Sequence, residues 1–366
     1  MCNYRHHNSA FSISTSCIKN RSLKRKVDFA IKDVFKGFLL SETEEVVIEF
    51  IFTDEIDNFI IDDQCMRVKD IKVSNLQTHF KDNELEFLVN NENIFKVYIN
   101  VSNNESFKSS VRFFNKSFKN KIEQQITTFY YRIFLLFSQL WNIKNDLSYL
   151  HSSSVEISGE SIVFTADSGV GKSSLLFRLS EEKAVSFIAD DLTILSSESE
   201  VFYQGRSLSV KPYHLRYFSF LEDKLKKIML RGQKFQWKLI NDNRLTYRIT
   251  PNHLFDNIVT SSKIKRVIHL CNHSDRDFKI SEISCKDLVK YTNSILINEL
   301  YLANSKLNAV ASLPNSPFIY SSELYNKVSQ IYLKAFDNIE IILVLVPFMS
   351  DPNELYEFLK TEGCLD

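Results

Sequence analysis

Residues 151–179 read HSSSVEISGESIVFTADSGVGKSSLLFRL, and this stretch decides the fold. Two apolar runs, Val155–Ile157 and Ile162–Phe164, flank a glycine-bearing turn, which predicts a β-hairpin. The segment ADSGVGKS at 166–173 follows the second run, and apolar residues at helical spacing follow it over Lys172–Leu179. A strand, a glycine-bearing loop and a helix in this order predict an α/β fold.

The segment 166–173 matches the phosphate-loop pattern G-x-x-x-x-G-K-[ST] at every fixed position except the first, where Ala166 replaces glycine. Glycine lets successive backbone N–H groups turn toward phosphate oxygens, and the helix that follows adds the positive end of its dipole. In this pattern Lys172 reaches the β- and γ-phosphates, and the Ser173 hydroxyl binds Mg²⁺. The sequence therefore predicts a site for ATP and Mg²⁺, whose nucleotide-binding residues are Asp167, Ser168, Gly169, Val170, Gly171, Lys172, Ser173 and Ser174.

Two adjacent carboxylates, Asp190 and Asp191, follow the next apolar run, Val185–Ala189. Beside a phosphate loop, one acid can bind Mg²⁺ while the other accepts the proton of the attacking hydroxyl. We predict that both acids are catalytic together with Lys172, and that Asp191 shares the metal with Ser173. The residues leave open which acid is the base, and the alternative is that the pair merely begins a turn.

Further charged residues are candidates for the same site. His151 opens the hairpin, and strand pairing would carry it toward the phosphate loop, where imidazole can orient a carboxylate or the γ-phosphate. Phosphoryl transfer also favours an additional cation, for which Arg206 and Arg248 are the candidates. Each of these three residues can instead be structural. The basic segment 224–238 either docks an acidic peptide, serves as a lid or forms a solvated helix face.

The chain of 366 residues is long enough for two domains. Strand-like runs at Glu45–Phe52, Glu84–Val89 and Phe95–Val101 predict a β-rich accessory domain over 1–118. A helical pattern predicts a linking helix at 119–145, and the phosphate-loop domain then spans 146–366. Within that last domain we predict buried strands and a closing helix, at Lys265–Cys271, Ile339–Val346 and Pro352–Thr361.

Composition excludes several classes of partner. Basic and acidic residues number 45 each, so the chain has no net positive charge that would attract nucleic acid or an anionic membrane. The most apolar helical candidate, Thr127–Trp141, contains Arg132 and is too short to cross a bilayer. The six cysteines show no C-x-x-C pair, which favours reduced thiols in the cytoplasm. We predict a cytoplasmic protein that binds neither nucleic acid nor membrane, and a homo-oligomer is left open.

The quoted stretch and the later FIADD at 187–191 together resemble the catalytic core of the HPr kinase/phosphorylase family. In that family a histidine opens a short hairpin, a G-D-S-G-x-G-K-S loop follows, and a strand ends in A-D-D. The resemblance implies a phosphate-loop kinase core of the HPr-kinase C-terminal-domain type that uses ATP and Mg²⁺ to phosphorylate a Ser or Thr hydroxyl. It maps the active-site roles onto His151, Lys172, Ser173, Asp190 and Asp191.

The chain also departs from that family. Ser174 stands where HPr kinases usually carry Glu, Ala166 replaces the first glycine, and no second glycine-containing signature follows the double Asp. The chain is therefore more similar to the wider group of HPr-kinase-like proteins, some of which resemble kinases of ribosomally made peptides. We predict a kinase acting on a peptide or protein, such as a natural-product precursor peptide. The alternatives are a small-molecule kinase, since phosphoenolpyruvate carboxykinases resemble this core, and a nucleotide-gated interaction protein with slow ATPase activity.

Overall fold

The computed structural model describes residues 2–41, 45–61, 64–81, 85–102, 120–229, 231–240, 245–314, 316–348 and 350–366. These residues form two units of mixed α/β structure. The first unit comprises the described residues up to 102, those at 120–144, and Leu300–Lys327, and the second comprises Asn145–Glu299 and Val328–Asp366. The predicted domain boundaries stay a prediction, but the structure groups Leu300–Lys327 with the first unit rather than with the region predicted as the kinase domain.

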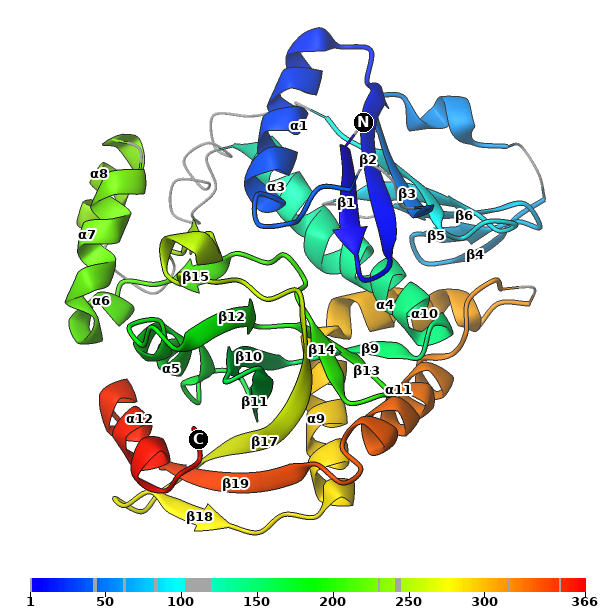
Figure 1. Cartoon of the computed structure of the whole chain (residues 1–366). Coiled ribbons are helices and arrows are strands. Elements are labelled where there is room, and N and C mark those ends of the chain that lie inside the picture. Colours follow the sequence, from blue (N-terminus) through cyan, green and yellow to red (C-terminus); the bar gives the residue numbers. More distant parts are fainter. Residues whose placement is uncertain are drawn as a thin grey trace. The chain divides into compact units, whose positions relative to one another are not determined.

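The first unit is built on an eight-stranded sheet in the order β1-β2-β3-β8-β7-β6-β5-β4 (Figure 1). The pairs β2–β3 and β3–β8 are parallel, and the other pairs are antiparallel. The predicted strands are confirmed as β3, β7 and β8, although Glu84 lies outside the described residues. The strands are β1 (Cys2–His6), β2 (Ser9–Cys17), β3 (Val46–Thr53), β4 (Met66–Val68), β5 (Ile71–Val73), β6 (Gln77–Lys81), β7 (Glu86–Asn90) and β8 (Lys96–Asn100).

Aromatic side chains form the core of this unit. Phe11, Phe35, Phe50, Phe129 and Phe134 are fully buried, and their rings meet in tilted and edge-to-face pairs. The predicted linking helix at 119–145 is present over Lys121–Lys144, but a π-helical turn divides it, and residue 119 lies outside the described ranges. The helical elements of the unit are α1 (Arg21–Val34), a 3₁₀ turn (Ile56–Phe59), α3 (Lys121–Phe129), the π turn (Tyr130–Phe134), α4 (Leu135–Lys144) and α10 (Tyr301–Ala311).

The second unit contains a nine-stranded sheet in which the order β12-β10-β11-β17-β14-β13-β9 is extended by β19 and β18. The predicted hairpin is confirmed, because β10 and β11 pair antiparallel with Ile157 opposite Glu160. The predicted strand at Lys265–Cys271 is confirmed within β17, and the one at Ile339–Val346 is confirmed as β19 except for Ile339, which precedes it; both strands run parallel to β11. The strands are β9 (Leu147–Leu150), β10 (Ser152–Ile157), β11 (Glu160–Ala166), β12 (Val185–Ala189), β13 (Thr193–Ser196), β14 (Glu200–Phe202), β17 (Ser261–His273), β18 (Lys279–Ser281) and β19 (Glu340–Pro347).

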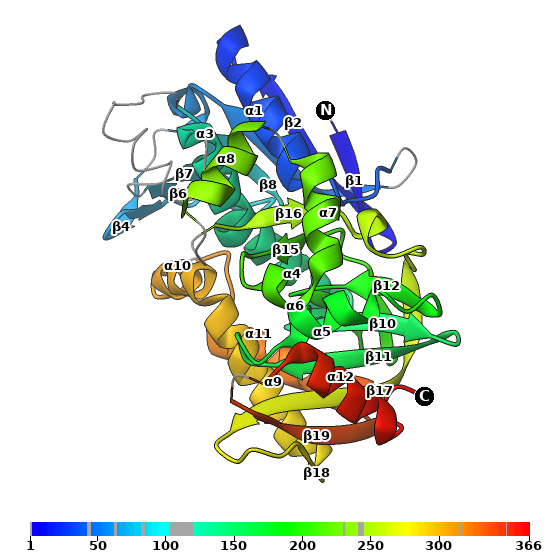
Figure 2. The ribbon, with the colours of Figure 1, turned by 90° about the vertical axis from the view of Figure 1, so that its left-hand side faces the viewer.

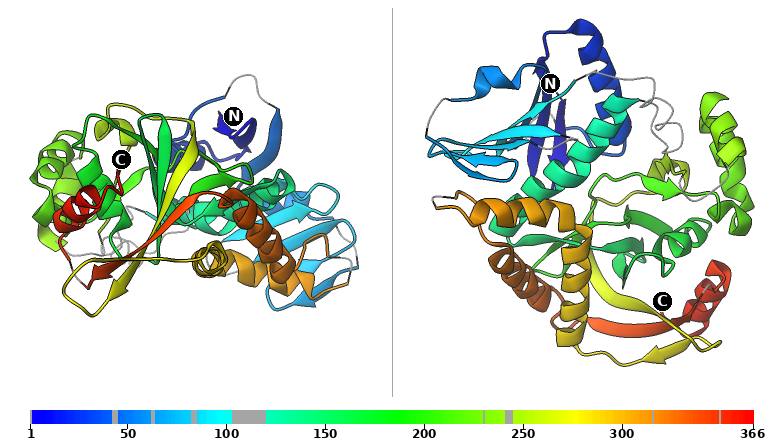
Figure 3. Two further views of the ribbon diagram at one scale, coloured as in Figure 1. Left: turned by 60° about the horizontal axis from the view of Figure 1, so that its bottom comes forward. Right: turned by 180° about the vertical axis from the view of Figure 1, so that it is seen from behind.

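Two sets of helix contacts in this unit matter for the site. Helix α12 packs beside α5 (Figure 2), and α9 contacts β9 and β11 (Figure 3). The predicted closing helix is confirmed with its bounds as α12, which Asp351 caps at the N-terminus. The remaining elements are α5 (Lys172–Leu179), a two-stranded sheet of β15 (Leu208–Val210) and β16 (Tyr247–Ile249), α6 (His214–Tyr217), α7 (Ser219–Ile228), α8 (Arg231–Ile240), a 3₁₀ turn (Pro251–His253), α9 (Cys285–Glu299), α11 (Ser321–Ala335), whose residues from 328 belong to this unit, and α12 (Pro352–Thr361).

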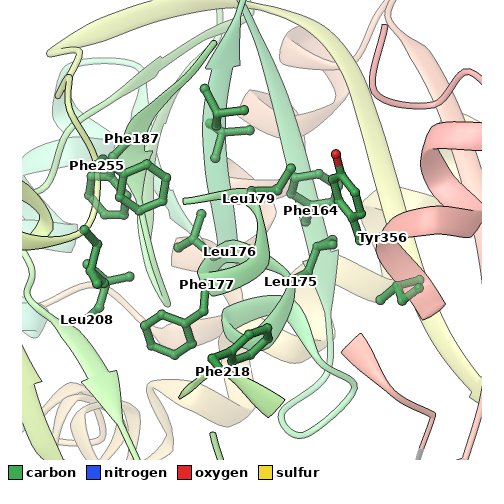
Figure 4. Close-up of a cluster of buried hydrophobic side chains, with 14 of the residues drawn as sticks. Phe164, Leu175, Leu176, Phe177, Leu179, Phe187, Leu208, Phe218, Phe255 and Tyr356 are labelled. Carbon is green, nitrogen blue, oxygen red and sulfur yellow. The ribbon is translucent and has the colours of Figure 1, made fainter. Parts of the chain in front are cut away.

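A large apolar cluster fixes α5 to the sheet (Figure 4). Leu175, Leu176 and Leu179 of α5 are buried in the same cluster as Phe164 of β11 and Phe187 of β12. Each buried side chain of this size contributes about 1.5–3 kcal/mol through the removal of apolar surface from water. The beginning of α5, and with it the loop at 166–173, is therefore held in a fixed position against β11 and β12.

No helix within the described ranges combines the length and the apolar character needed to span a membrane.

Candidate functional site

The loop at 166–173 connects the end of β11 to the beginning of α5. Gly169 and Gly171 have φ values of 91° and 119°, which side-chain-bearing residues rarely adopt, so the backbone itself requires glycine there. A Cβ atom added at either position would meet no atom within 4 Å, so both backbones border open space. Ala166 is buried at the end of β11 in extended conformation, which explains why the first position of the pattern tolerates a methyl group.

Lys172 is buried at the first position of α5 and folds back on this loop. Its Nζ donates to the carbonyl oxygens of Ala166 at 2.8 Å and Asp167 at 3.0 Å, and to Nε2 of His151 at 3.0 Å. Burial lowers the pKa of Lys172 to about 8, although Asp190 and other nearby carboxylates act in the opposite direction. The ammonium group therefore lies at the mouth of the loop with all three protons engaged.

His151 lies between β9 and β10 and is buried beside Lys172. Because its Nε2 accepts from Lys172, we assign the ring proton to Nδ1. Nδ1 is buried without a hydrogen-bond partner, and Oδ1 of Asp191 lies 3.8 Å from it. Burial, together with the charges of Lys172 and Arg206, lowers the pKa of His151 to about 2. The imidazole is therefore neutral and presents one N–H toward Asp191.

The two predicted acids point to different partners. Oδ1 of Asp190 accepts from the hydroxyls of Ser173 at 3.0 Å and Ser153 at 2.7 Å. Asp191 has a left-handed backbone with φ of 69°, and its carboxylate forms an ion pair with Arg206. Asp adopts this conformation more readily than most residues that carry a side chain, and it turns the chain after β12. The predicted metal pair was Ser173 with Asp191, whereas the acid that contacts Ser173 in the structure is Asp190.

The two candidate arginines lie on different segments of the second unit. Arg206 lies beside Asp191, and Arg248 lies on β16, opposite Ser209 in the two-stranded sheet. The basic segment at 224–238 covers the second half of α7 and most of α8, with Gly232 in the first turn of α8. Of the paired acids, Asp191 is the one that pairs with Arg206.

Three residues at the site were not predicted from the sequence. Glu299, the last residue of α9, accepts a hydrogen bond of 2.8 Å from the Ser168 hydroxyl through its Oε1. The Tyr213 hydroxyl hydrogen-bonds with Ser174, and burial raises the pKa of this tyrosine. Ser153 contacts Asp190, and the run of three serines in the predicted hairpin was a signal that could have identified it. No comparable signal marks Glu299 or Tyr213.

A metal at this site would depend on ligands that the nucleotide brings. Within the described residues, no three His, Cys, Asp or Glu side chains are grouped so that they could hold a metal ion by themselves. The Mg²⁺ of phosphate-loop enzymes is instead held by one hydroxyl, one acid and phosphate oxygens. Ser173 and Asp190 provide such a hydroxyl and acid 3.0 Å apart, so the residues present fit this kind of metal.

Among solved structures, the chain is similar to the HPr(Ser) kinase/phosphatase from Coxiella burnetii, with a TM-score of 0.27 and 11% sequence identity over 59% of this chain and 91% of that chain. No protein-family model matches the sequence, and no curated protein matches it significantly. The structural relationship is distant.

Proposed function

We propose that this chain is a kinase that uses ATP and Mg²⁺ to phosphorylate a hydroxyl group of a peptide or protein. One observation carries the proposal: charged and polar side chains from separate parts of the second unit converge on one loop. They come from the end of β9, from the beginning of α5, from the turn after β12 and from the segment before β15. They are His151, Lys172, Ser173, Asp190, Asp191 and Arg206.

The loop and Lys172 would bind the phosphates. The open space beside Gly169 and Gly171 leaves room for oxygen atoms close to the backbone, and α5 directs its N-terminal end to the same place. Lys172 would exchange its two carbonyl partners for phosphate oxygens, which are stronger acceptors because they are charged. Ser173 and Asp190 would hold Mg²⁺, which when bound neutralises the charge on the β- and γ-phosphates.

Asp191 is the better candidate for the general base. Its side chain is 36% exposed, so a hydroxyl can approach it, whereas Asp190 is buried under two hydroxyl donors. Arg206 pairs with the Asp191 carboxylate, and the N–H of His151 faces it, so both can orient it. His151 itself is unsuited to proton abstraction, because its pKa of about 2 makes it too weak a base.

The surface of α8 supports a peptide acceptor over a small molecule. Phe235 and Leu239 are exposed, and Arg231, Lys234 and Lys238 lie on the same face at helical spacing. Cations interleaved with apolar side chains complement an acidic peptide that carries an apolar anchor. A metabolite would need no such surface. The paired acids likewise support transfer to an organic hydroxyl, because a nucleotide switch needs only one acid at its metal.

The test is to follow the γ-phosphoryl group. The protein is incubated with γ-labelled ATP, Mg²⁺ and a library of Ser- and Thr-containing peptides with acidic flanking residues. We expect labelled phosphate on peptide hydroxyls, and loss of the label with Lys172→Ala. Lys183→Ala, which removes an exposed lysine just after α5, is the matched control and should retain activity. Release of free phosphate alone, or labelling that survives Lys172→Ala, would contradict the proposal.

A further inference from the structure

Glu299 places a negative charge on the loop that would bind phosphate. Its Oε1 accepts from the Ser168 hydroxyl at 2.8 Å and lies 4.0 Å from Nε2 of His151, which in turn accepts from Lys172. The charge of Glu299 acts favourably on the Lys172 ammonium. The groups that a triphosphate would use are therefore already in contact with, or close to, a carboxylate of the chain itself.

The stability of α9 does not explain this glutamate. The last turn of a helix carries the negative end of the helix dipole, so a carboxylate there is unfavourable, and α9 has no basic residue in that turn to offset it. Burial does not force the position either, because 29% of the Glu299 side chain is exposed. The favourable partners of Glu299 are Ser168 and the neighbouring Lys172, both of which belong to the proposed phosphate site.

We propose that Glu299 takes the place of a phosphate group in the nucleotide-free protein and thereby sets the affinity for the nucleotide. This inference rests on the proposed function. To bind, a triphosphate has to displace the carboxylate from Ser168 and compete with its charge for Lys172. Glu299 is thus a residue that determines affinity rather than a catalytic residue, and it favours ligands that bring enough negative charge to replace it.

Glu299→Gln separates charge from shape, because the amide keeps an oxygen that accepts from Ser168 and removes only the negative charge. Two charges about 4–5 Å apart at a partly exposed site interact by about 1 kcal/mol or somewhat more. The variant should therefore bind a non-hydrolysable ATP analogue with Mg²⁺ about five- to tenfold more tightly. The gain should shrink at high salt, because mobile ions screen exposed charges. Binding of AMP, which lacks the outer phosphates, should be unchanged.

The measurement is calorimetric titration of the full chain, with Glu282→Gln as the control, because it removes an exposed acid just before α9. Unchanged affinity in Glu299→Gln would overturn the inference, and so would weaker binding together with a lower melting temperature, which would mean that Glu299 only supports the loop. Should the amide variant fail to fold, Glu299→Ala repeats the test with a good helix former. Absence of nucleotide binding in the wild-type protein would instead remove the proposed function itself.

Discussion

Replacing Lys172 with methionine removes a buried ammonium group while keeping a linear side chain, and the consequence for stability should depend on pH. The folded-state pKa of Lys172 is about 8, against an ordinary value of 10.5. Below about pH 8 Lys172 is protonated in both the folded and the unfolded chain. Burial of the charged ammonium group then lowers the stability of the folded chain. Between these two values the folded chain has lost the proton and the unfolded chain retains it, so the free energy of unfolding of the wild type rises with pH.

The full separation of the two pKa values corresponds to about 3 kcal/mol. About 2 kcal/mol of this change in the free energy of unfolding takes place between pH 7 and pH 9.5. Lys172→Met has no proton to lose at this position. The free energy of unfolding of the wild type should therefore rise by about 2 kcal/mol relative to that of the variant over this range. The pKa of Lys172 determines how the stability difference between wild type and variant changes with pH. The size of that difference at any one pH also includes the hydrogen bonds that the ammonium group makes.

Urea unfolding followed by the fluorescence of Trp237 gives this difference for the second unit, because Trp237 lies in α8. The chain has two tryptophans, so Trp141→Phe is introduced into every protein compared. Lys183→Met is the control: this exposed lysine should give a difference from wild type that does not vary between pH 7 and pH 9.5. A constant difference for Lys172→Met as well would mean that the lysine titrates normally, and would refute the burial argument.

Three other predictions concern the acids and the buried histidines. Asp191→Asn should lower kcat about 10²–10⁴-fold while leaving the Kd of an ATP analogue within about twofold, and an unchanged kcat in the transfer assay would exclude it as the base. Asp190→Asn should raise the Mg²⁺ concentration needed for half-maximal activity, and a Mg²⁺ titration like that of the wild type would exclude it as a ligand. Burial lowers the pKa values of His151, His214 and His269 to about 2, 3 and 4, so the unfolded chain takes up protons first as pH falls below 6.5. Each histidine should then lower the free energy of unfolding by about 2 kcal/mol by pH 5, so the melting temperature should fall as the pH decreases. A melting temperature that does not change between pH 7 and pH 5 would contradict the burial of these histidines as neutral rings.

Features that depend on neighbouring residues could be predicted from the sequence. The hairpin followed from two apolar runs around Gly159, and α12 followed from the segment Pro352–Thr361 with the glycine at 363 beyond it. The meeting of His151 with Lys172 was also within reach, because an antiparallel hairpin brings its two ends together. In each case the interaction is set by spacing along a single short segment.

Features that depend on distant residues or on backbone conformation could not be predicted in this way. Glu299 lies 131 residues from its partner Ser168, and nothing in its own sequence neighbourhood distinguishes it from a surface glutamate. The two acids diverge because Asp191 adopts a left-handed conformation, which the letters A-D-D do not specify. The place of Leu300–Lys327 likewise depends on packing against residues far away in the sequence, so this segment could not be assigned to the first unit.

The charges gathered at the site explain why metal and nucleotide would have to act together. Lys172 and Arg206 supply two positive charges, whereas Asp167, Asp190, Asp191 and Glu299 supply four negative charges, and His151 is neutral. A triphosphate alone would therefore approach a group of residues whose net charge is already negative. A divalent cation between Ser173 and Asp190 would offset that negative net charge, and displacement of Glu299 would remove a further negative charge. Under the proposed function, these residues do more than bind nucleotide: they make its binding conditional on the metal that the chemistry requires.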